Sequence, residues 1–295
     1  MDASKLCSLN LQIDGIEIVR KVLPSRKVHE LLTICFAVRR QWLECDPLTG
    51  RPGGDERLET CMRHVNHPSY FKKDPKRLRL VLEACANETM VSALRKAWGA
   101  QPVFRSTTLF FNPTVDQPAS WHRDSQFAHR DPAEERDTIL KRAAAGGCTV
   151  AQVQLPLIDG DDLEYVPGSH RRWDTAEESE RRLSEDPKAR CRVKFPGAVC
   201  CAVKAGDGVV FDPYGIHRGR YSACRPRMTL MVTFVQSSSR PELDRFSFQP
   251  WFLTNGYLDG LSPHATGVYR RFIDRYGSLW HDDTYTQHFH SSRRS

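Results

Sequence analysis

Apolar and polar side chains alternate regularly along residues 227 to 234, which read RMTLMVTF. In an extended strand, side chains two residues apart share a face. The faces are Met228, Leu230, Val232 and Phe234 on one side, and Arg227, Thr229, Met231 and Thr233 on the other. One apolar face and one mixed polar face predict a barrel strand that packs outward on helices and lines a functional cavity inward.

Residues 107–113, 150–157 and 205–212 also have strand character, the last after a Gly-containing turn. In the second of these segments, Gln152 and Gln154 share one face. Two inward glutamines fit a cavity lined for a polar ligand. An edge strand that turns its glutamine face to water is the alternative.

Helical spacing of apolar residues appears between and after these strands. Ser25 is a predicted N-cap for a helix whose apolar positions run from Val28 to Phe36. One or two further helices are predicted over residues 76–98, and a closing helix over residues 268–276. The expected fold class is therefore mixed, with a mainly β core backed by N-terminal and C-terminal helices.

The composition is that of an ordinary globular protein, with 295 residues of which 40% are apolar and 27% charged. We expect one domain over residues 1–287 and a disordered polar tail over residues 288–295. The net charge of +7 is modest and spread along the chain, so a nucleic-acid partner is not expected, although an anionic substrate would suit it.

Ten cysteines occur without a C-x-x-C pair, which does not suggest a disulfide framework in a chain of this length. The N-terminus lacks the basic and apolar regions of a signal peptide, and nowhere do eighteen apolar residues run together. We therefore expect a reduced, cytoplasmic setting with no membrane partner, and free thiols at most of these positions.

The candidate chemistry begins at His122-Arg123-Asp124. If this segment is extended, its imidazole and carboxylate point the same way. Together they form two thirds of the His/His/carboxylate triad that holds Fe(II) and leaves three coordination positions open. His217 follows a later predicted strand and is favoured as the third ligand over His170, which lies in a Pro-Gly-Ser-His turn.

Arg227 lies ten residues after His217, on the polar face of its strand. Its planar guanidinium can receive a carboxylate through two parallel hydrogen bonds and stays protonated when buried. Arg225 is a rival, but Pro226 separates it from the alternating strand. Arg218 and Arg220 flank the candidate ligand His217 and are either receptors for an acidic substrate or exposed loop residues.

Four ordered segments resemble the phytanoyl-CoA dioxygenase family of Fe(II)/2-oxoglutarate-dependent oxygenases. They are the opening Ile13–Leu23, His122-Arg123-Asp124, the run LEYVPGSH at 163–170, and Ala205-Gly206-Asp207 leading to His217 and Arg227. The resemblance implies a double-stranded β-helix, with His122, Asp124 and His217 as iron ligands. It also implies that Arg227 holds the distal carboxylate of 2-oxoglutarate.

Among the other polar residues, Asn112, Gln152 and Thr229 are candidate contacts of 2-oxoglutarate. Asn112 ends a strand that lines the co-substrate pocket in the family, although an Asn before Pro is more often a turn residue. The other two lie on the inward faces of their strands.

The expected activity is oxidation of a small molecule by Fe(II), 2-oxoglutarate and O2, with succinate and CO2 released. Because related halogenases lack the carboxylate, Asp124 favours oxygenation and hence hydroxylation. The sequence departs from the family at Asp159-Gly160-Asp161-Asp162, which replaces the usual turn, so an acyl-coenzyme A substrate is not carried over. Two alternatives are a cupin-type metal enzyme that does not use 2-oxoglutarate and a non-catalytic member of the fold.

Two further features have alternative interpretations. A short helix is predicted at residues 131–146, with Asp131 as its N-cap, and it is either a lid over the iron entrance or a solvated surface element. His64 and His67 are predicted to be surface or capping histidines and not metal ligands, because no third ligand accompanies them. Aromatic residues near the motifs are either a substrate pocket or core, namely Trp121, Phe127, Tyr165, Trp173 and Tyr214.

Overall fold

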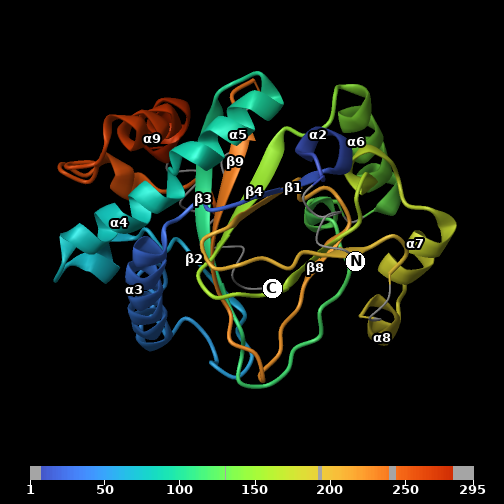
Figure 1. Ribbon diagram of the computed structural model, residues 1–295, viewed down its shortest axis with the longest axis horizontal. Coiled ribbons are helices and arrows are strands. Elements are labelled where there is room, and N and C mark those ends of the chain that lie inside the picture. The colour runs from blue at the N-terminus through green and yellow to red at the C-terminus, as the bar shows by residue number, and fades with distance from the viewer. Residues whose placement is uncertain (1–7, 130, 192–194, 239–243, 282–295) are drawn as a thin grey trace.

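A six-stranded antiparallel sheet lies at the centre of the computed structural model, which describes residues 8–129, 131–191, 195–238 and 244–281 (Figure 1). Its strands, in spatial order, are β1 (Ile16–Val19), β7 (Gly208–Phe211), β4 (Val150–Pro156), β9 (Met228–Gln236), β3 (Pro102–Phe111) and β2 (Cys61–Arg63). A second sheet has the order β6 (Val199–Cys200), β5 (Leu163–Tyr165) and β8 (His217–Gly219). Two antiparallel sheets are the core that the sequence predicts.

Helices cover the outer face of the large sheet on the left of Figure 1. They are α3 (Ser25–Glu44), α4 (Pro75–Cys85), α5 (Glu88–Trp98) and α9 (Pro263–Tyr276). Their apolar stripes form one buried cluster with the predicted apolar face of β9. The inference that this strand packs outward on helices is therefore confirmed, since Leu230 and Phe234 are fully buried there.

The inner face of the large sheet packs on the small sheet. A second apolar cluster joins them, formed by Ile16, Leu163, Tyr165, Val199, Cys201, Val209 and Phe211. Short helices lie beyond the small sheet, on the right of Figure 1: α2 (Leu11–Asp14), α6 (Pro132–Ala144), α7 (Ala176–Arg182) and α8 (Pro187–Arg190). The 3-10 turns are η1 (Pro68–Phe71), η2 (Asp124–Phe127), η3 (Ser169–Arg171), η4 (Pro250–Leu253) and η5 (Gly277–His281).

Element ends differ in places from the prediction. The predicted N-cap Ser25 is the first helical residue of α3, and Pro24 holds the cap position without a side-chain bond. Pro has a φ suited to the start of a helix, so no polar cap is needed to begin one there. By contrast, Asp131 caps α6 as predicted, because its carboxylate accepts from the Ala133 backbone N–H at 2.8 Å.

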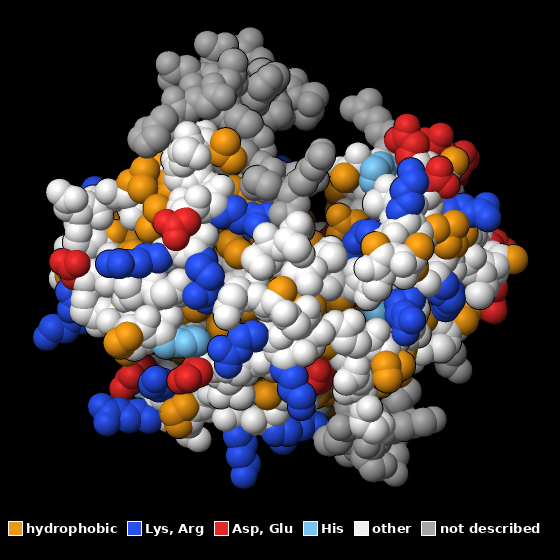
Figure 2. All heavy atoms as spheres, turned by 90° about the horizontal axis from the view of Figure 1, so that it is seen from above, with side chains coloured by type: hydrophobic (Ala, Val, Ile, Leu, Met, Phe, Trp, Pro, Cys, Tyr) orange, Lys and Arg blue, Asp and Glu red, His pale blue; other side chains and the backbone are white. Residues whose placement is uncertain are grey.

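All cysteines within the described ranges are free thiols, as predicted. None of the helices described is long and apolar enough to cross a membrane. On the face shown in Figure 2, Lys and Arg side chains are scattered among polar and apolar ones and do not form one continuous stripe. The predicted tail at 288–295 lies outside the described residues.

Candidate metal centre

The backbone brings the two motif segments together. His122 and His217 exchange both backbone hydrogen bonds, at 3.0 and 2.9 Å, as an isolated antiparallel bridge. Arg123 is extended, with φ −115° and ψ 142°, so His122 and Asp124 point to the same side. The Asp124 N–H then donates to the Pro213 carbonyl at 2.9 Å, which fixes the start of η2. The predicted extended geometry of the H-x-D segment is what aligns the two side chains.

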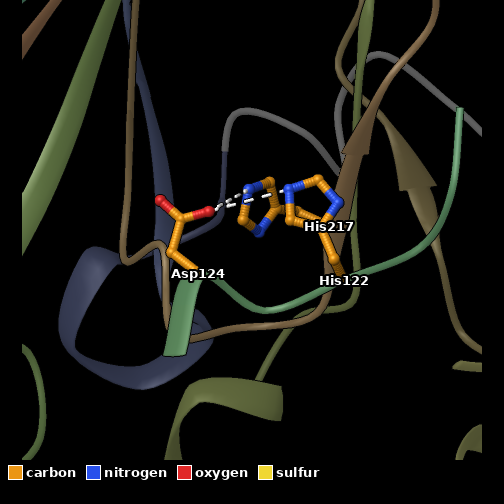
Figure 3. A group of neighbouring side chains, drawn as sticks. All are labelled: His122, Asp124 and His217. Atoms are coloured by element: carbon orange, nitrogen blue, oxygen red, sulfur yellow. Dashed lines mark ion pairs between the residues drawn. The ribbon is translucent and has the colours of Figure 1, made fainter. Parts of the chain in front are cut away.

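The three predicted ligands converge at one point (Figure 3). Asp124 Oδ1 lies 3.6 Å from His122 Nε2 and 3.6 Å from His217 Nε2. They form the one group of three or more potential metal-ligating side chains within the described residues. Two ligands at right angles on a metal with bonds of about 2.1 Å lie about 3 Å apart. The three ligand atoms all lie within 4.8 Å of one another, so an inward movement of the side chains would bring them to the spacing of a facial triad.

Both imidazoles are held so that Nε2 faces the centre. His122 Nδ1 lies 2.9 Å from the Ser120 carbonyl, and His217 Nδ1 lies 3.0 Å from the Gly215 carbonyl. Because a backbone carbonyl can only accept a hydrogen bond, Nδ1 carries the proton in each ring, which leaves the Nε2 lone pair free for a metal. A side chain at Gly215 would overlap the Tyr165 ring, so glycine permits this close approach beside His217.

The electrostatics also suit a cation. Burial lowers the pKa of His217 well below its ordinary value, and the neighbouring His122 lowers it further. His217 is therefore neutral near pH 7, which is the form that binds a metal. Exclusion of water by the surrounding protein raises the pKa of Asp124, while His122 and the bond from Gln152 oppose that rise. A divalent cation here would meet two neutral nitrogens and one carboxylate, a donor set that fits Fe(II).

Gln152 supports the candidate ligand Asp124 directly. Its amide Nε2 donates to Asp124 Oδ2 at 2.7 Å, so Oδ1 is left facing the two imidazoles. The side chain points inward from β4, as the alternation predicts, but its amide is engaged with the candidate ligand. A contact between Gln152 and 2-oxoglutarate stays a prediction.

Replacing Gln152 with leucine is expected to weaken Fe(II) binding by about tenfold to a hundredfold, because residues that orient metal ligands typically contribute that much. Anaerobic Fe(II) titration of the purified protein measures the change. Gln154→Leu is the matched control, since that side chain is the next one inward on β4 and makes no bond to Asp124. Equal Fe(II) affinity in the two variants would contradict an orienting role.

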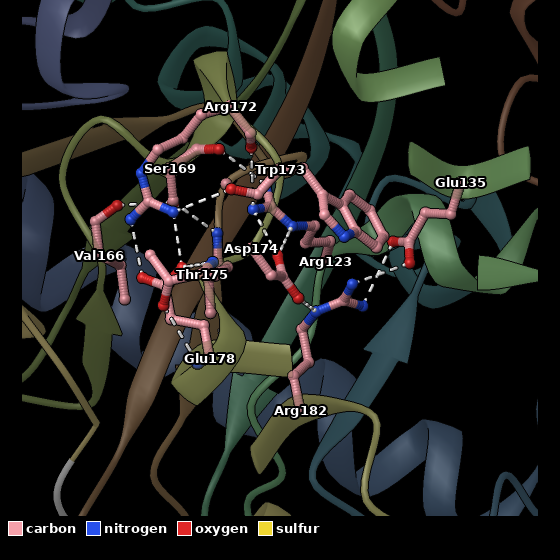
Figure 4. Close-up of polar contacts among 12 residues, drawn as sticks. Arg123, Glu135, Val166, Ser169, Arg172, Trp173, Asp174, Thr175, Glu178 and Arg182 are labelled. Atoms are coloured by element: carbon pink, nitrogen blue, oxygen red, sulfur yellow. Dashed lines mark hydrogen bonds and ion pairs between the residues drawn. The ribbon is translucent and has the colours of Figure 1, made fainter. Parts of the chain in front are cut away.

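Arg123 lies between the candidate ligands His122 and Asp124 in the sequence, and its side chain joins a buried network of polar contacts (Figure 4). Its guanidinium is fully buried and donates to Asp174 Oδ1 from Nε and Nη2 at 3.0 and 2.8 Å. Further bonds reach the backbone carbonyls of Ser169 (2.8 Å), Tyr214 (2.6 Å) and Arg172 (3.2 Å). One side chain thus links the His122–Asp124 segment to the loop that carries His217.

The same network anchors α6. Arg182 donates to Asp174 Oδ2 at 2.7 Å and to Glu135 Oε2 at 3.0 Å, and Ser125 Oγ donates to Glu135 Oε1 at 2.6 Å. Glu135 is the buried acid on a helix whose other acidic residues are exposed. One side of α6 faces water, while the opposite side is fixed through Glu135 to Ser125, the residue next to Asp124. A lid movement of this helix stays a prediction.

Replacing Arg123 with methionine is expected to lower the free energy of unfolding by about 3 kcal/mol, because removing one partner strands buried charge and backbone acceptors. Urea unfolding measures it. Arg181→Met is the control, since Arg181 forms a surface i,i+4 pair with Glu177, a class of interaction that contributes below about 1 kcal/mol. A loss of under about 1 kcal/mol at Arg123 would show that the network is not stabilising.

Arg227 is buried at the other end of the inner face, with Thr229 beside it on β9. Its guanidinium carbon lies 5.0 Å from the Phe110 ring centroid and 5.1 Å from that of Tyr221. Asn112, by contrast, donates its amide to the Arg225 carbonyl at 2.6 Å. Arg227 and Thr229 are thus brought together, and Asn112 is engaged elsewhere; all three co-substrate roles stay predictions.

The arginines that flank His217 already have acidic partners. Arg218 is buried and donates to Glu164 Oε2 at 2.5 Å, so it is not an exposed loop residue. Arg220 pairs with Asp161 at 3.2 Å. Neither guanidinium is therefore a ready receptor for an acidic substrate.

Three other histidines considered in the sequence, His64, His67 and His170, do not belong to the group formed by His122, Asp124 and His217. His67 caps η1 as predicted, because its Nδ1 accepts from the Ser69 N–H at 3.3 Å. His64 is not a surface residue: it is buried, because its ring packs edge-on against Trp251 and its Nε2 contacts the Arg245 carbonyl at 3.0 Å. His170 is also fully buried, under Gly15.

Among the aromatic residues near the motifs, Phe127 is the exposed one. Its side chain is 73% exposed, and its ring centroid lies 5.6 Å from that of His122. Trp121 and Tyr165 are fully buried core residues, and Trp173 and Tyr214 pack on arginines. These five aromatic residues therefore do not form one shared pocket, and Phe127 is the one whose ring faces solvent beside the candidate ligand His122.

The chain was compared with known proteins. The family model described as Phytanoyl-CoA dioxygenase (PhyH) matches residues 12–228. No curated protein sequence matches the chain.

Several solved structures are similar in fold. AviO1 from Streptomyces viridochromogenes Tue57 has 19% identity and a TM-score of 0.54, covering 82% of this chain and 98% of that one. The non-heme monooxygenase ThoJ, solved with Ni, has 15% identity and a TM-score of 0.52, with 91% and 96% coverage. EctD from S. alaskensis, solved with 2-oxoglutarate and 5-hydroxyectoine, has 17% identity and a TM-score of 0.51, with 86% and 83% coverage. Together with the two packed antiparallel sheets, these likenesses confirm the predicted double-stranded β-helix.

Proposed function

Since the chain belongs to the phytanoyl-CoA dioxygenase family, we propose that it is an Fe(II)- and 2-oxoglutarate-dependent oxygenase that hydroxylates a small organic molecule. The proposal takes residues 1–287 as one oxygenase domain. The observation that carries it is the convergence of His122, Asp124 and His217, whose ligand atoms all lie within 4.8 Å of one another, with Asp124 Oδ1 3.6 Å from each Nε2. This donor set is the facial triad of non-heme Fe(II) oxygenases.

The three ligands would hold the metal by one face, and Gln152 would keep Oδ1 of Asp124 aimed at it. When bound, Fe(II) with 2-oxoglutarate and O2 supplies the oxidising chemistry, with succinate and CO2 as co-products. Arg227 would bind the far carboxylate of 2-oxoglutarate and thereby orient its 2-oxo acid end toward the triad. The buried surroundings of Arg227, between Phe110 and Tyr221, exclude water and strengthen that charge pair.

A substrate would approach from the solvent side, where Phe127 stands beside His122. An exposed aromatic ring at this place can pack on an apolar part of a small molecule and hold a C–H bond near the metal. This supports a small-molecule substrate with at least one apolar surface.

The test is turnover with Fe(II), 2-oxoglutarate and O2 across a panel of small molecules, followed by succinate assay and mass spectrometry. We expect succinate in equal amount to a product that is heavier by one oxygen atom. Succinate formed with a product that has gained no oxygen would overturn hydroxylation but leave 2-oxoglutarate use intact. Substrate oxidation without any 2-oxoglutarate requirement would instead favour a cupin-type enzyme.

A further inference from the structure

Arg227 has one edge that faces a carboxylate of the protein itself. The side chain is 1% exposed, and its Nη1 donates to the Arg220 carbonyl at 3.5 Å. Its Nε lies 3.7 Å from Asp162 Oδ2, beyond hydrogen-bond distance, and Nε has no hydrogen-bond partner among the described residues. The edge of a guanidinium that includes Nε is one that binds carboxylates bidentately.

Asp162 is set apart from the other acids of its loop. Asp161 turns outward and pairs with Arg220 and Arg225. The Asp162 side chain is 13% exposed and turns inward to Arg227. Burial raises the pKa of the Asp162 carboxyl, while Arg227 and Arg220 oppose the rise.

The space next to Asp162 is small. Asp162 lines a cavity of about 10 Å³ together with Gln154, Leu163 and Thr229. That volume accommodates about one water molecule, far less than a five-carbon diacid. Asp162 Oδ2 lies 3.7 Å from Arg227 Nε, so a far carboxylate that paired with this edge of Arg227 would displace the Asp162 side chain or lie against it. Two carboxylates that close together repel each other.

We propose that Asp162 determines co-substrate specificity by competing with the far carboxylate of 2-oxoglutarate for Arg227. A 2-oxo acid with an uncharged far end does not meet this competition. The preference of the site for 2-oxoglutarate over such acids is therefore weaker than it would be with Arg227 alone. The inference rests on the proposed function. Replacing Asp162 by a neutral residue of the same shape removes the competing charge and leaves Arg227 in place.

The experiment titrates 2-oxoglutarate, and separately 2-oxopentanoate, anaerobically into the Fe(II)-loaded protein and follows the visible absorption of the chelate. We expect Asp162→Asn to bind 2-oxoglutarate about fivefold to tenfold more tightly than wild type, with 2-oxopentanoate affinity unchanged. Asp162→Ala should shift the dissociation constant in the same direction. Asp159→Asn is the matched control, because that acid is exposed on the same loop and pairs with Lys204.

Retained Fe(II) affinity in each variant shows that the triad is still folded. Unchanged 2-oxoglutarate affinity in both Asp162 variants would overturn the inference. Weaker binding would also overturn it, since Asp162 would then be a residue that positions Arg227. If wild type and variants alike bind Fe(II) but give no absorption with either acid, the proposed function itself fails, and that result is distinct from the other two.

Discussion

Replacing Asp124 with alanine is expected to weaken Fe(II) binding by more than about a thousandfold. The carboxylate is the one anionic donor of the triad, and its Oδ1 is equidistant from the two imidazole nitrogens. Without it, two neutral nitrogens would face the cation and Gln152 would lose its acceptor. Anaerobic Fe(II) titration, with metal content measured after desalting, gives the change in affinity.

Two comparisons sharpen this result. Asp124→Asn keeps the shape but removes the charge, so a similar loss is expected. Glu177→Gln, an exposed change on α7, should leave Fe(II) affinity as in wild type. If the alanine variant retained the metal at wild-type affinity, the three side chains would not be the ligand set.

Replacing Arg227 with alanine is expected to raise the dissociation constant of 2-oxoglutarate by about a hundredfold to a thousandfold while Fe(II) affinity is kept. A buried, hydrogen-bonded charge pair typically contributes about 2–5 kcal/mol to binding. The guanidinium is held between Phe110 and Tyr221, apart from the ligands, so its removal leaves the triad intact. Titration of 2-oxoglutarate into the Fe(II)-loaded variant separates the two effects.

Arg225→Ala is the matched control, because Arg225 is the rival two residues earlier and its side chain is 37% exposed and paired with Asp161. Its loss should leave 2-oxoglutarate affinity within about twofold, as expected for a surface pair. Normal 2-oxoglutarate affinity in the Arg227 variant would show that the co-substrate is held elsewhere or not used.

Much of the site follows from local sequence. The H-x-D segment aligns its two candidate ligands because Arg123 is extended, and a period-two pattern places Arg227 and Thr229 on one inner face. The sequence favours His217 over His170 because His217 is followed, ten residues later, by Arg227 at the start of the alternating strand. The fold class followed from the same alternation, since β9 is apolar on its outer face and pairs with both β3 and β4.

Other parts depend on contacts between distant positions, which no periodicity encodes. Of the two orientations that the sequence leaves open for Gln152, the structure has the inward one, and its bond to Asp124 arises only when β4 lies beside the motif. The network around Arg123 joins residues 135, 174 and 182, whose separations along the chain carry no repeating signal.

The turn at Asp161-Asp162 also has one feature that the sequence shows and one that depends on packing. Two acids in place of the usual turn were visible as a departure, but which one turns inward depends on packing. Arg225 and Arg220 take Asp161, and Arg227 is left facing Asp162. The sequence suggested that this loop disfavours a phosphorylated carrier, and the structure shows that one of its acids faces Arg227, the residue proposed to bind the co-substrate.

The most direct test of the central claim is anaerobic titration of the apoprotein with Fe(II) and then with 2-oxoglutarate, followed by visible absorption. The proposed function predicts binding of one Fe(II) and then a weak visible metal-to-ligand charge-transfer band that saturates at one 2-oxoglutarate per site. Fe(II) binding without any band would contradict 2-oxoglutarate use and favour a cupin-type enzyme, and failure to bind Fe(II) would identify the chain as a non-catalytic member of the fold.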